Sequence, residues 1–111
     1  MSGNVYFLEP ADGAGLQNPI HLKFAVDGDL EVRPAGDNTP NTGHFCLIID
    51  GRPIPRGNVV PVSERSIHFT KGQSEGDIRL NPGMHTLTLQ FTDGAHRSYG
   101  PELSQTITVN V

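Results

Sequence analysis

Apolar and polar residues alternate along several short runs of the chain. In the clearest run, Ile20, Leu22, Phe24 and Val26 share one face of an extended strand, and His21 lies on the opposite face. We therefore expect His21 to point to solvent. Runs of this kind recur at close spacing, and each is bounded by Gly, Pro, Asn or Asp, which is typical of a β-sandwich or barrel.

The runs predict an all-β fold, most simply an immunoglobulin-like antiparallel β-sandwich of about seven strands with no substantial helix. A chain of 111 residues fits one such domain, so residues 1–111 are predicted to form a single β-sandwich domain. Thirteen glycines, nine prolines and no run of strong helix formers favour the same class. The candidate strands are 5–8, 20–26, 44–50, 58–62, 66–69, 77–80, 85–91 and 107–111.

Residues 27–50 contain two contrasting segments. The segment 27–43 is rich in Asp, Gly, Pro, Asn and Thr, which predicts a long ordered loop or a short edge strand. The next run has five consecutive apolar residues at 45–49, which predicts a strand covered on both faces. The preceding loop or a partner subunit could cover its outer face, so a homodimer through the 45–49 strand is one possible assembly.

Charge and hydropathy exclude some classes of partner. The net charge of −4 is spread along the chain and leaves no basic stripe, so we expect no nucleic-acid binding. No apolar run approaches the roughly 18 residues that a membrane span needs. The N-terminus has neither the basic nor the apolar region of a signal peptide, although such a segment could have been removed, so the compartment stays open.

One pair of residues carries the sharpest chemical signal. His44 and Cys46 are two positions apart, so on a strand they point to one side with their Cα atoms roughly 6.5–7 Å apart. An imidazole and a thiolate at this spacing could share zinc or copper, and a nearby Met84 thioether would favour copper. The alternative is a cysteine that packs as a small apolar residue.

Three other histidines lie at strand ends or beside turns. His68 sits between two apolar residues and should face away from the core, as a surface residue or as a ligand. His96 follows a turn sequence, and loops often carry binding residues. His85 lies where sandwich domains often carry a tyrosine that bonds back to the backbone at a corner, so a structural role is favoured over ligation.

Six motifs, in order along nearly the whole chain, resemble the bacterial domain-of-unknown-function family numbered 4399. Members of that family usually have three consecutive histidines where this chain has His44, Phe45 and Cys46, so Cys46 takes the place of the third. The resemblance implies a histidine-rich immunoglobulin-like sandwich, usually exported, whose histidine positions survive here as His44, His68, His85 and His96. It carries over no activity. The motifs are Pro34-Ala35-Gly36, Gly43-His44-x-Cys46-Leu47-Ile48-Ile49-Asp50, His68-Phe69-x-x-Gly72-Gln73-Ser74-Glu75, Pro82-Gly83-x-His85-Thr86-Leu87, Asp93-Gly94-x-His96 and Ile107-Thr108-Val109.

Three functional hypotheses follow. The leading one is a small module that binds copper or zinc through His44, Cys46, His68 and His96, with His85 as a corner pin or a fifth ligand. The second is a non-catalytic protein-interaction or structural domain in which the histidines only hold loops in place. The third, an enzyme with an open metal position, is disfavoured because the chain shows no familiar catalytic motif, so we expect no enzymatic activity.

Overall fold

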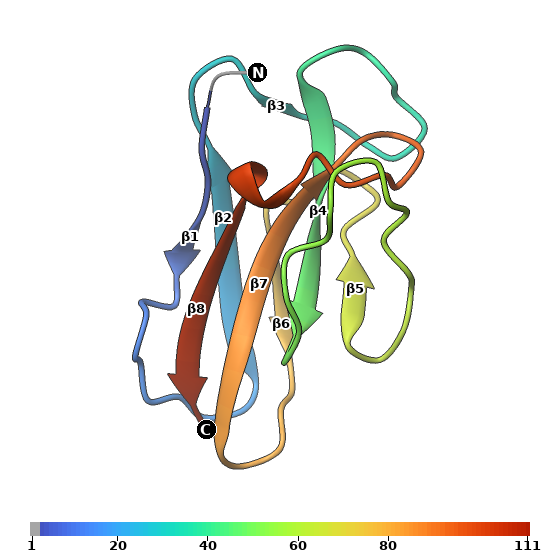
Figure 1. Cartoon of the computed structure of the whole chain (residues 1–111). Helices are drawn as coiled ribbons and strands as arrows, with labels where there is room; N and C mark the ends of the chain where they lie inside the picture. Colours follow the sequence, from blue (N-terminus) through green and yellow to red (C-terminus); the bar gives the residue numbers. More distant parts are fainter. Residues whose placement is uncertain (1–2) are drawn as a thin grey trace.

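The computed structural model describes residues 3–111, which form eight β-strands and one short 3-10 turn (Figure 1). This confirms the all-β prediction, with eight strands rather than about seven. The strands are β1 (Val5–Glu9), β2 (Ile20–Val26), β3 (Glu31–Val32), β4 (Thr42–Ile49), β5 (Ser66–His68), β6 (Glu75–Ile78), β7 (Met84–Thr92) and β8 (Ser104–Asn110). The 3-10 turn, η1, covers Pro101–Leu103. No helix among residues 3–111 is long and apolar enough to cross a membrane.

The strands form two sheets that face each other. One sheet has the order β1-β2-β6, and the other has the order β3-β4-β7-β8, with β5 paired to β4. All pairings are antiparallel except the two-residue contact between β3 and β4. Because β4 contacts β3, β5 and β7, it is the strand around which the larger sheet is organised.

The core lies between the two sheets and is filled by the alternating apolar residues of each strand. Phe24 of the smaller sheet packs on Phe45 of the larger one with ring centroids 5.1 Å apart, and Phe45 packs on Phe91 at 5.6 Å. Leu22 and Leu89 are fully buried beside them. The predicted alternation of β2 is confirmed, because Ile20, Leu22 and Phe24 are buried and His21 is exposed.

One predicted strand is missing from the structure. The expected strand at 58–62 is absent as a strand, and only Val59 makes an isolated bridge, to Arg97. Pro55 and Pro61 lack the N–H groups that a strand ladder needs, which accounts for the irregular path. The 27–43 segment contains the short edge strand β3, as one of the two alternatives predicted.

Every residue of β4 is buried, as the run of apolar residues predicted. Phe45, Leu47 and Ile49 face the core, and the outer face of the strand carries His44, Cys46 and Ile48. The chain covers this outer face with residues 54–61 and 96–103. The strand is therefore buried within the single chain, and the homodimer through the 45–49 strand stays a prediction.

The side chain of Gln90 on β7 holds this cover in place. Its Oε1 accepts a hydrogen bond from the Ile54 N–H at 3.0 Å, and its Nε2 donates to the Gly100 carbonyl at 2.8 Å. Ser98 Oγ donates to the Ile54 carbonyl at 2.7 Å, which ties the two covering segments to each other. A buried amide with both ends satisfied fixes the position of both segments over β4.

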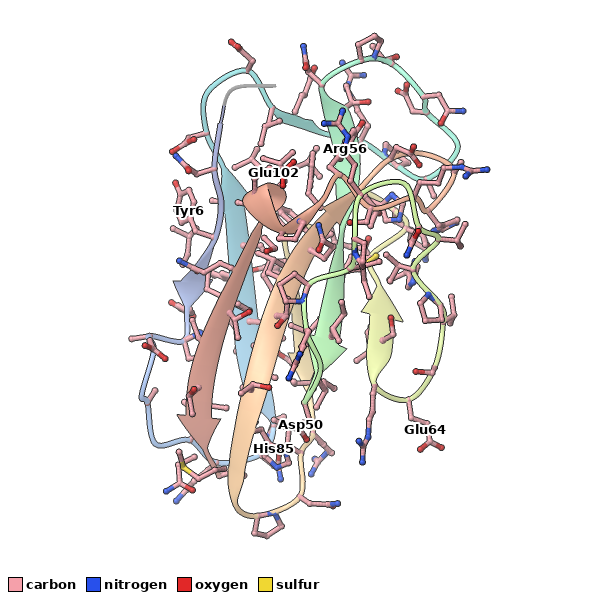
Figure 2. All side chains as sticks on the ribbon, viewed as in Figure 1. Tyr6, Asp50, Arg56, Glu64, His85 and Glu102 are labelled. Atoms are coloured by element: carbon pink, nitrogen blue, oxygen red, sulfur yellow. The ribbon has the colours of Figure 1, made fainter. Side chains whose placement is uncertain are left out.

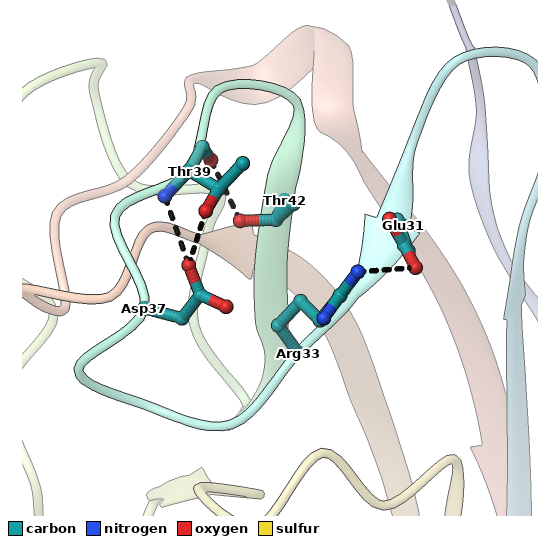
Figure 3. Close-up of polar contacts among 5 residues, drawn as sticks. All are labelled: Glu31, Arg33, Asp37, Thr39 and Thr42. Atoms are coloured by element: carbon teal, nitrogen blue, oxygen red, sulfur yellow. Dashed lines mark hydrogen bonds and ion pairs between the residues drawn. The ribbon is translucent and has the colours of Figure 1, made fainter.

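The loop before β4 is ordered by short side-chain bonds (Figure 3). Asp37 Oδ1 accepts hydrogen bonds from the N–H and the hydroxyl of Thr39, at 3.0 and 2.6 Å, and Thr42 Oγ1 donates to the Thr39 carbonyl at 2.7 Å. The Gly36 N–H donates to the Gly94 carbonyl at 2.9 Å. This loop therefore supports the 93–97 turn, which carries one of the candidate ligands.

Candidate metal centre

Three candidate ligands converge on the outer face of the larger sheet. His44 and Cys46 share this face of β4, and Cys46 is directly opposite His68 in the antiparallel pairing of β4 with β5. One ligand atom from each of His44, Cys46 and His68 lies within 4.8 Å of the other two. His44 and Cys46 are fully buried, and His68 is half-buried. Strand alternation and cross-strand pairing are thus enough to build the group.

His96 joins this group from the 93–97 turn. Its Nδ1 lies 3.0 Å from His68 Nδ1, and its ring centroid is 5.0 Å from that of His44. We call His44, Cys46, His68 and His96 the histidine-cysteine cluster. The cluster contains four of the five predicted site residues, drawn from two strands and a turn.

The 93–97 turn is shaped by the carboxylate of Asp93. Its Oδ1 accepts hydrogen bonds from the N–H groups of Ala95 and Arg97, at 2.8 and 2.9 Å. His96 between them has a positive φ of 64°, a left-handed conformation in which Asn, Asp and His are the most enriched residues other than glycine. At Gly94 a Cβ atom would lie 2.4 Å from the Asp37 carbonyl oxygen, so only glycine fits there. The turn thus holds the His96 ring toward β4.

The second nitrogens of two rings are already occupied by oxygen atoms. His68 Nε2 lies 3.0 Å from the Pro61 carbonyl, which can only accept, so this nitrogen carries the proton and Nδ1 accepts a hydrogen bond from His96 Nδ1 at 3.0 Å. His44 Nε2 lies 3.2 Å from Thr92 Oγ1, which also lies 3.6 Å from Cys46 Sγ, and His44 Nδ1 is buried with no hydrogen-bond partner. Metal-bound histidines are commonly held by an oxygen atom on the ring nitrogen that does not bind the ion.

Burial keeps His44, His68 and Cys46 uncharged at neutral pH. Burial, helped by the nearby His96 and His68, lowers the pKa of His44 to about 4, and burial also lowers the pKa of His68. Burial raises the pKa of the Cys46 thiol to about 12. In the metal-free protein His44 and His68 are therefore neutral imidazoles and Cys46 is a thiol, and a metal ion would have to displace the thiol proton in order to bind sulfur.

The spacing is close to that of a coordinated ion. Two nitrogen ligands of one tetrahedral ion lie about 3.4 Å apart, and a nitrogen and a sulfur about 3.6 Å apart. The His68 and His96 nitrogens are 3.0 Å apart, and the ligand atoms of His44, Cys46 and His68 lie within 4.8 Å of one another. Rotation about side-chain bonds would bring the ligand atoms of these three residues closer to the spacing around one ion.

His85 lies apart from the cluster. It hydrogen-bonds Asp50 Oδ2 through Nδ1 at 2.8 Å and donates through Nε2 to the Asn81 carbonyl at 2.7 Å. Figure 2 shows Asp50 and His85 together at the lower end of the sandwich, and Asp50 follows Cys46 by about 13 Å along the strand direction. The structure contains the bond back to the backbone that the corner-pin interpretation predicts.

Met84 does not contribute to the cluster either. It is 67% exposed at the start of β7 and pairs with Asn110. The residue of β7 opposite Cys46 is Gln90, which is six positions further along and thus about 20 Å away. The thioether that would have favoured copper is therefore remote from the cluster.

Few local patterns in the sequence point to the groups that orient the ligands. Thr92 and Pro61 hold His44 and His68 from positions distant in sequence, and their roles depend on how the strands pair. Asp93 is the one residue that local sequence could have indicated, because an Asp-Gly pair just before a histidine predicts a tight turn. Its carboxylate bonds shape the turn that carries His96.

Comparison with known proteins places the chain in a family without an assigned function. The family model described as a domain of unknown function, DUF4399, matches residues 22–111. This match covers most of the chain and includes every member of the cluster, so the chain belongs to this family and the resemblance seen in the motifs is confirmed. Neither a curated protein nor a solved structure matches the chain.

Proposed function

We propose that this member of the DUF4399 family is a small non-catalytic module that binds one copper or zinc ion through the histidine-cysteine cluster. His44, Cys46 and His68 form the base of the site, and His96 closes it from the 93–97 turn. Imidazole with thiolate is a ligand set that suits both of these metals.

The observation that carries the proposal is the unpartnered nitrogen of a fully buried histidine. His44 Nδ1 has no hydrogen-bond partner. Leaving such an atom unsatisfied costs about 1–3 kcal/mol, and buried polar atoms almost always find a partner. One ring nitrogen of this histidine lies within 4.8 Å of ligand atoms of Cys46 and His68. A bound ion would satisfy it and would account for the cost.

The hydrogen bonds of Asp93 favour a binding role for the cluster over a catalytic one. Asp93 acts electrostatically on His44, and its Oδ1 is already engaged by two backbone N–H groups. It is therefore poorly placed to serve as a general base for a metal-bound water. The competing interaction-domain hypothesis relied on an exposed outer face of β4, and this face is covered by residues 54–61 and 96–103.

The experiment is a metal titration of the metal-free protein with Zn²⁺ and, under anaerobic reducing conditions, with Cu⁺, each against a competing chromophoric chelator. We expect one ion per chain and a thiolate-to-metal charge-transfer band. The His68→Ala and Cys46→Ser variants should lose more than the roughly 10–100-fold in affinity that loss of an outer hydrogen-bond partner costs.

The matched control is His85→Ala, which removes a histidine outside the cluster. It should bind the ion as tightly as the unmodified chain. Micromolar or weaker binding of both ions by the unmodified chain would overturn the proposal, and so would equal losses in the His68→Ala and His85→Ala variants.

A further inference from the structure

The net charge of the ligands in the cluster bears on the choice between copper and zinc. When bound, the three histidines are neutral and Cys46 contributes one negative charge as a thiolate. The group of ligand atoms formed by His44, Cys46 and His68 contains no carboxylate oxygen among the described residues. The protein thus supplies one negative charge, which balances a monovalent ion and leaves a divalent ion with an excess positive charge.

The surroundings of the cluster make that excess charge costly. His44 and Cys46 are fully buried, and Val60 in the covering segment is 1% exposed. An ion at this place is shielded from water on the side of β4 and by the buried Val60, while His68 and His96 are only partly buried. An unbalanced charge in such a setting loses several kcal/mol of hydration that the protein does not replace.

Asp93 is the nearest group that could balance a second positive charge. It acts on His44, but it is half-buried and lies on the partly exposed turn. Its Oδ1 already accepts hydrogen bonds from the N–H groups of Ala95 and Arg97. Solvent screens a half-exposed charge, so Asp93 offsets only part of a second charge on the ion.

We propose that the cluster binds monovalent copper in preference to zinc and to divalent copper. This inference rests on the proposed metal-binding function and specifies its ligand. Soft thiolate with imidazole suits Cu⁺. The charge balance adds a reason that ligand type alone does not supply, because the same ligand types also suit Zn²⁺.

A matched pair of substitutions at His96 tests the charge reasoning. Asp and Asn both tolerate the positive φ of this position, so both variants should keep the turn. The His96→Asp variant adds one negative charge beside the ion, and the His96→Asn variant adds none. The measured quantity is the ratio of the Zn²⁺ and Cu⁺ dissociation constants, obtained by chelator competition.

For the unmodified chain we expect Cu⁺ to bind at least about a hundredfold more tightly than Zn²⁺. The His96→Asp variant should shift the ratio toward Zn²⁺ by about tenfold or more relative to His96→Asn. Circular dichroism of both variants verifies that the fold is retained.

The outcomes separate this inference from the function on which it rests. Tighter binding of Zn²⁺ than of Cu⁺ by the unmodified chain would overturn the preference and leave metal binding intact. Equal ratios in the two His96 variants would overturn the charge reasoning. Failure of the unmodified chain to bind either ion would overturn the proposed function, and the preference with it.

Discussion

The same substitution at two histidines should change stability in opposite directions. We predict that His44→Leu stabilises the metal-free protein and that His85→Leu destabilises it. Both residues lie on the larger sheet, but the nitrogens of His85 are both hydrogen-bonded, whereas His44 Nδ1 has no partner. The opposite signs follow from this difference in hydrogen bonding between the two rings and require no assumption about the metal.

The magnitudes follow from the bonds that each change removes. At His44 the change relieves an unsatisfied nitrogen that costs about 1–3 kcal/mol and removes one bond to Thr92, worth about 0.5–1.5 kcal/mol. Thr92 Oγ1 keeps its bond to the His44 main-chain carbonyl. The net gain is about 1 kcal/mol, or about 4 °C in Tm for a domain of this size.

At His85 the change removes the bond to the Asn81 carbonyl and the charge-assisted bond to Asp50. Asp50 is 34% exposed and recovers part of its hydration, so the expected loss is about 2 kcal/mol. Urea denaturation at pH 7 with a chelator present measures both changes. With metal added at a thousandfold excess over Kd, the unmodified chain and the His85→Leu variant should gain about 4 kcal/mol, and His44→Leu nothing.

A loss of more than about 1 kcal/mol on His44→Leu in the presence of chelator would refute the reasoning. It would mean that His44 is well satisfied in the metal-free protein, so its nitrogen would give no reason to expect an ion. Metal-dependent stabilisation of the His44→Leu variant equal to that of the unmodified chain would refute the assignment of His44 as a ligand.

Three further predictions follow. The pKa of His44 in the folded protein, about 4, lies below the ordinary histidine value of 6.5. Its contribution to metal-free stability is therefore complete above pH 6.5 and is lost as the pH falls toward 4. Urea titrations should show a loss of up to roughly 3 kcal/mol that His44→Leu removes. Hydrogen bonds to Asp50 and the Asn81 carbonyl raise the pKa of His85. The contribution of His85 to stability is therefore complete below pH 6.5 and fades as the pH rises through its raised pKa. The difference in stability between the unmodified chain and His85→Leu should be smaller at pH 9 than at pH 6. Because burial raises the pKa of the Cys46 thiol to about 12, binding of an ion should release about one proton per chain near pH 7. Calorimetry in buffers of different ionisation enthalpy measures this release. The Cys46→Ser variant should abolish it.

The parts of the fold that the sequence predicts are those set by strand alternation. The faces of β2 and the double burial of β4 follow from the order of apolar residues alone. The side shared by His44 and Cys46 follows from the same rule. The strand expected at 58–62 was wrong because its apolar residues serve as a cover over β4, where Val60 is buried in an irregular segment.

The convergence of the ligands depends on information that a single sequence lacks. The pairing of Cys46 with His68 is a register between two strands, and the approach of His96 depends on the Asp93 turn. Like the other candidate histidines, His85 lies near a turn and a strand. It is remote from the cluster because it lies at the beginning of β7, and the cluster lies near the other end of that strand. Long-range pairing, rather than local pattern, separates the two roles.

If the histidine-cysteine cluster is a metal site, one sulfur and at least two imidazole nitrogens bind the same ion. X-ray absorption spectroscopy of the metal-loaded protein at the copper or zinc edge measures these neighbours. We expect one sulfur neighbour at about 2.3 Å and two or three imidazole nitrogens at about 2.0 Å, with the sulfur signal lost in Cys46→Ser and retained in His85→Ala. A metal surrounded only by oxygen and nitrogen, or a sulfur signal that persists in Cys46→Ser, would contradict it.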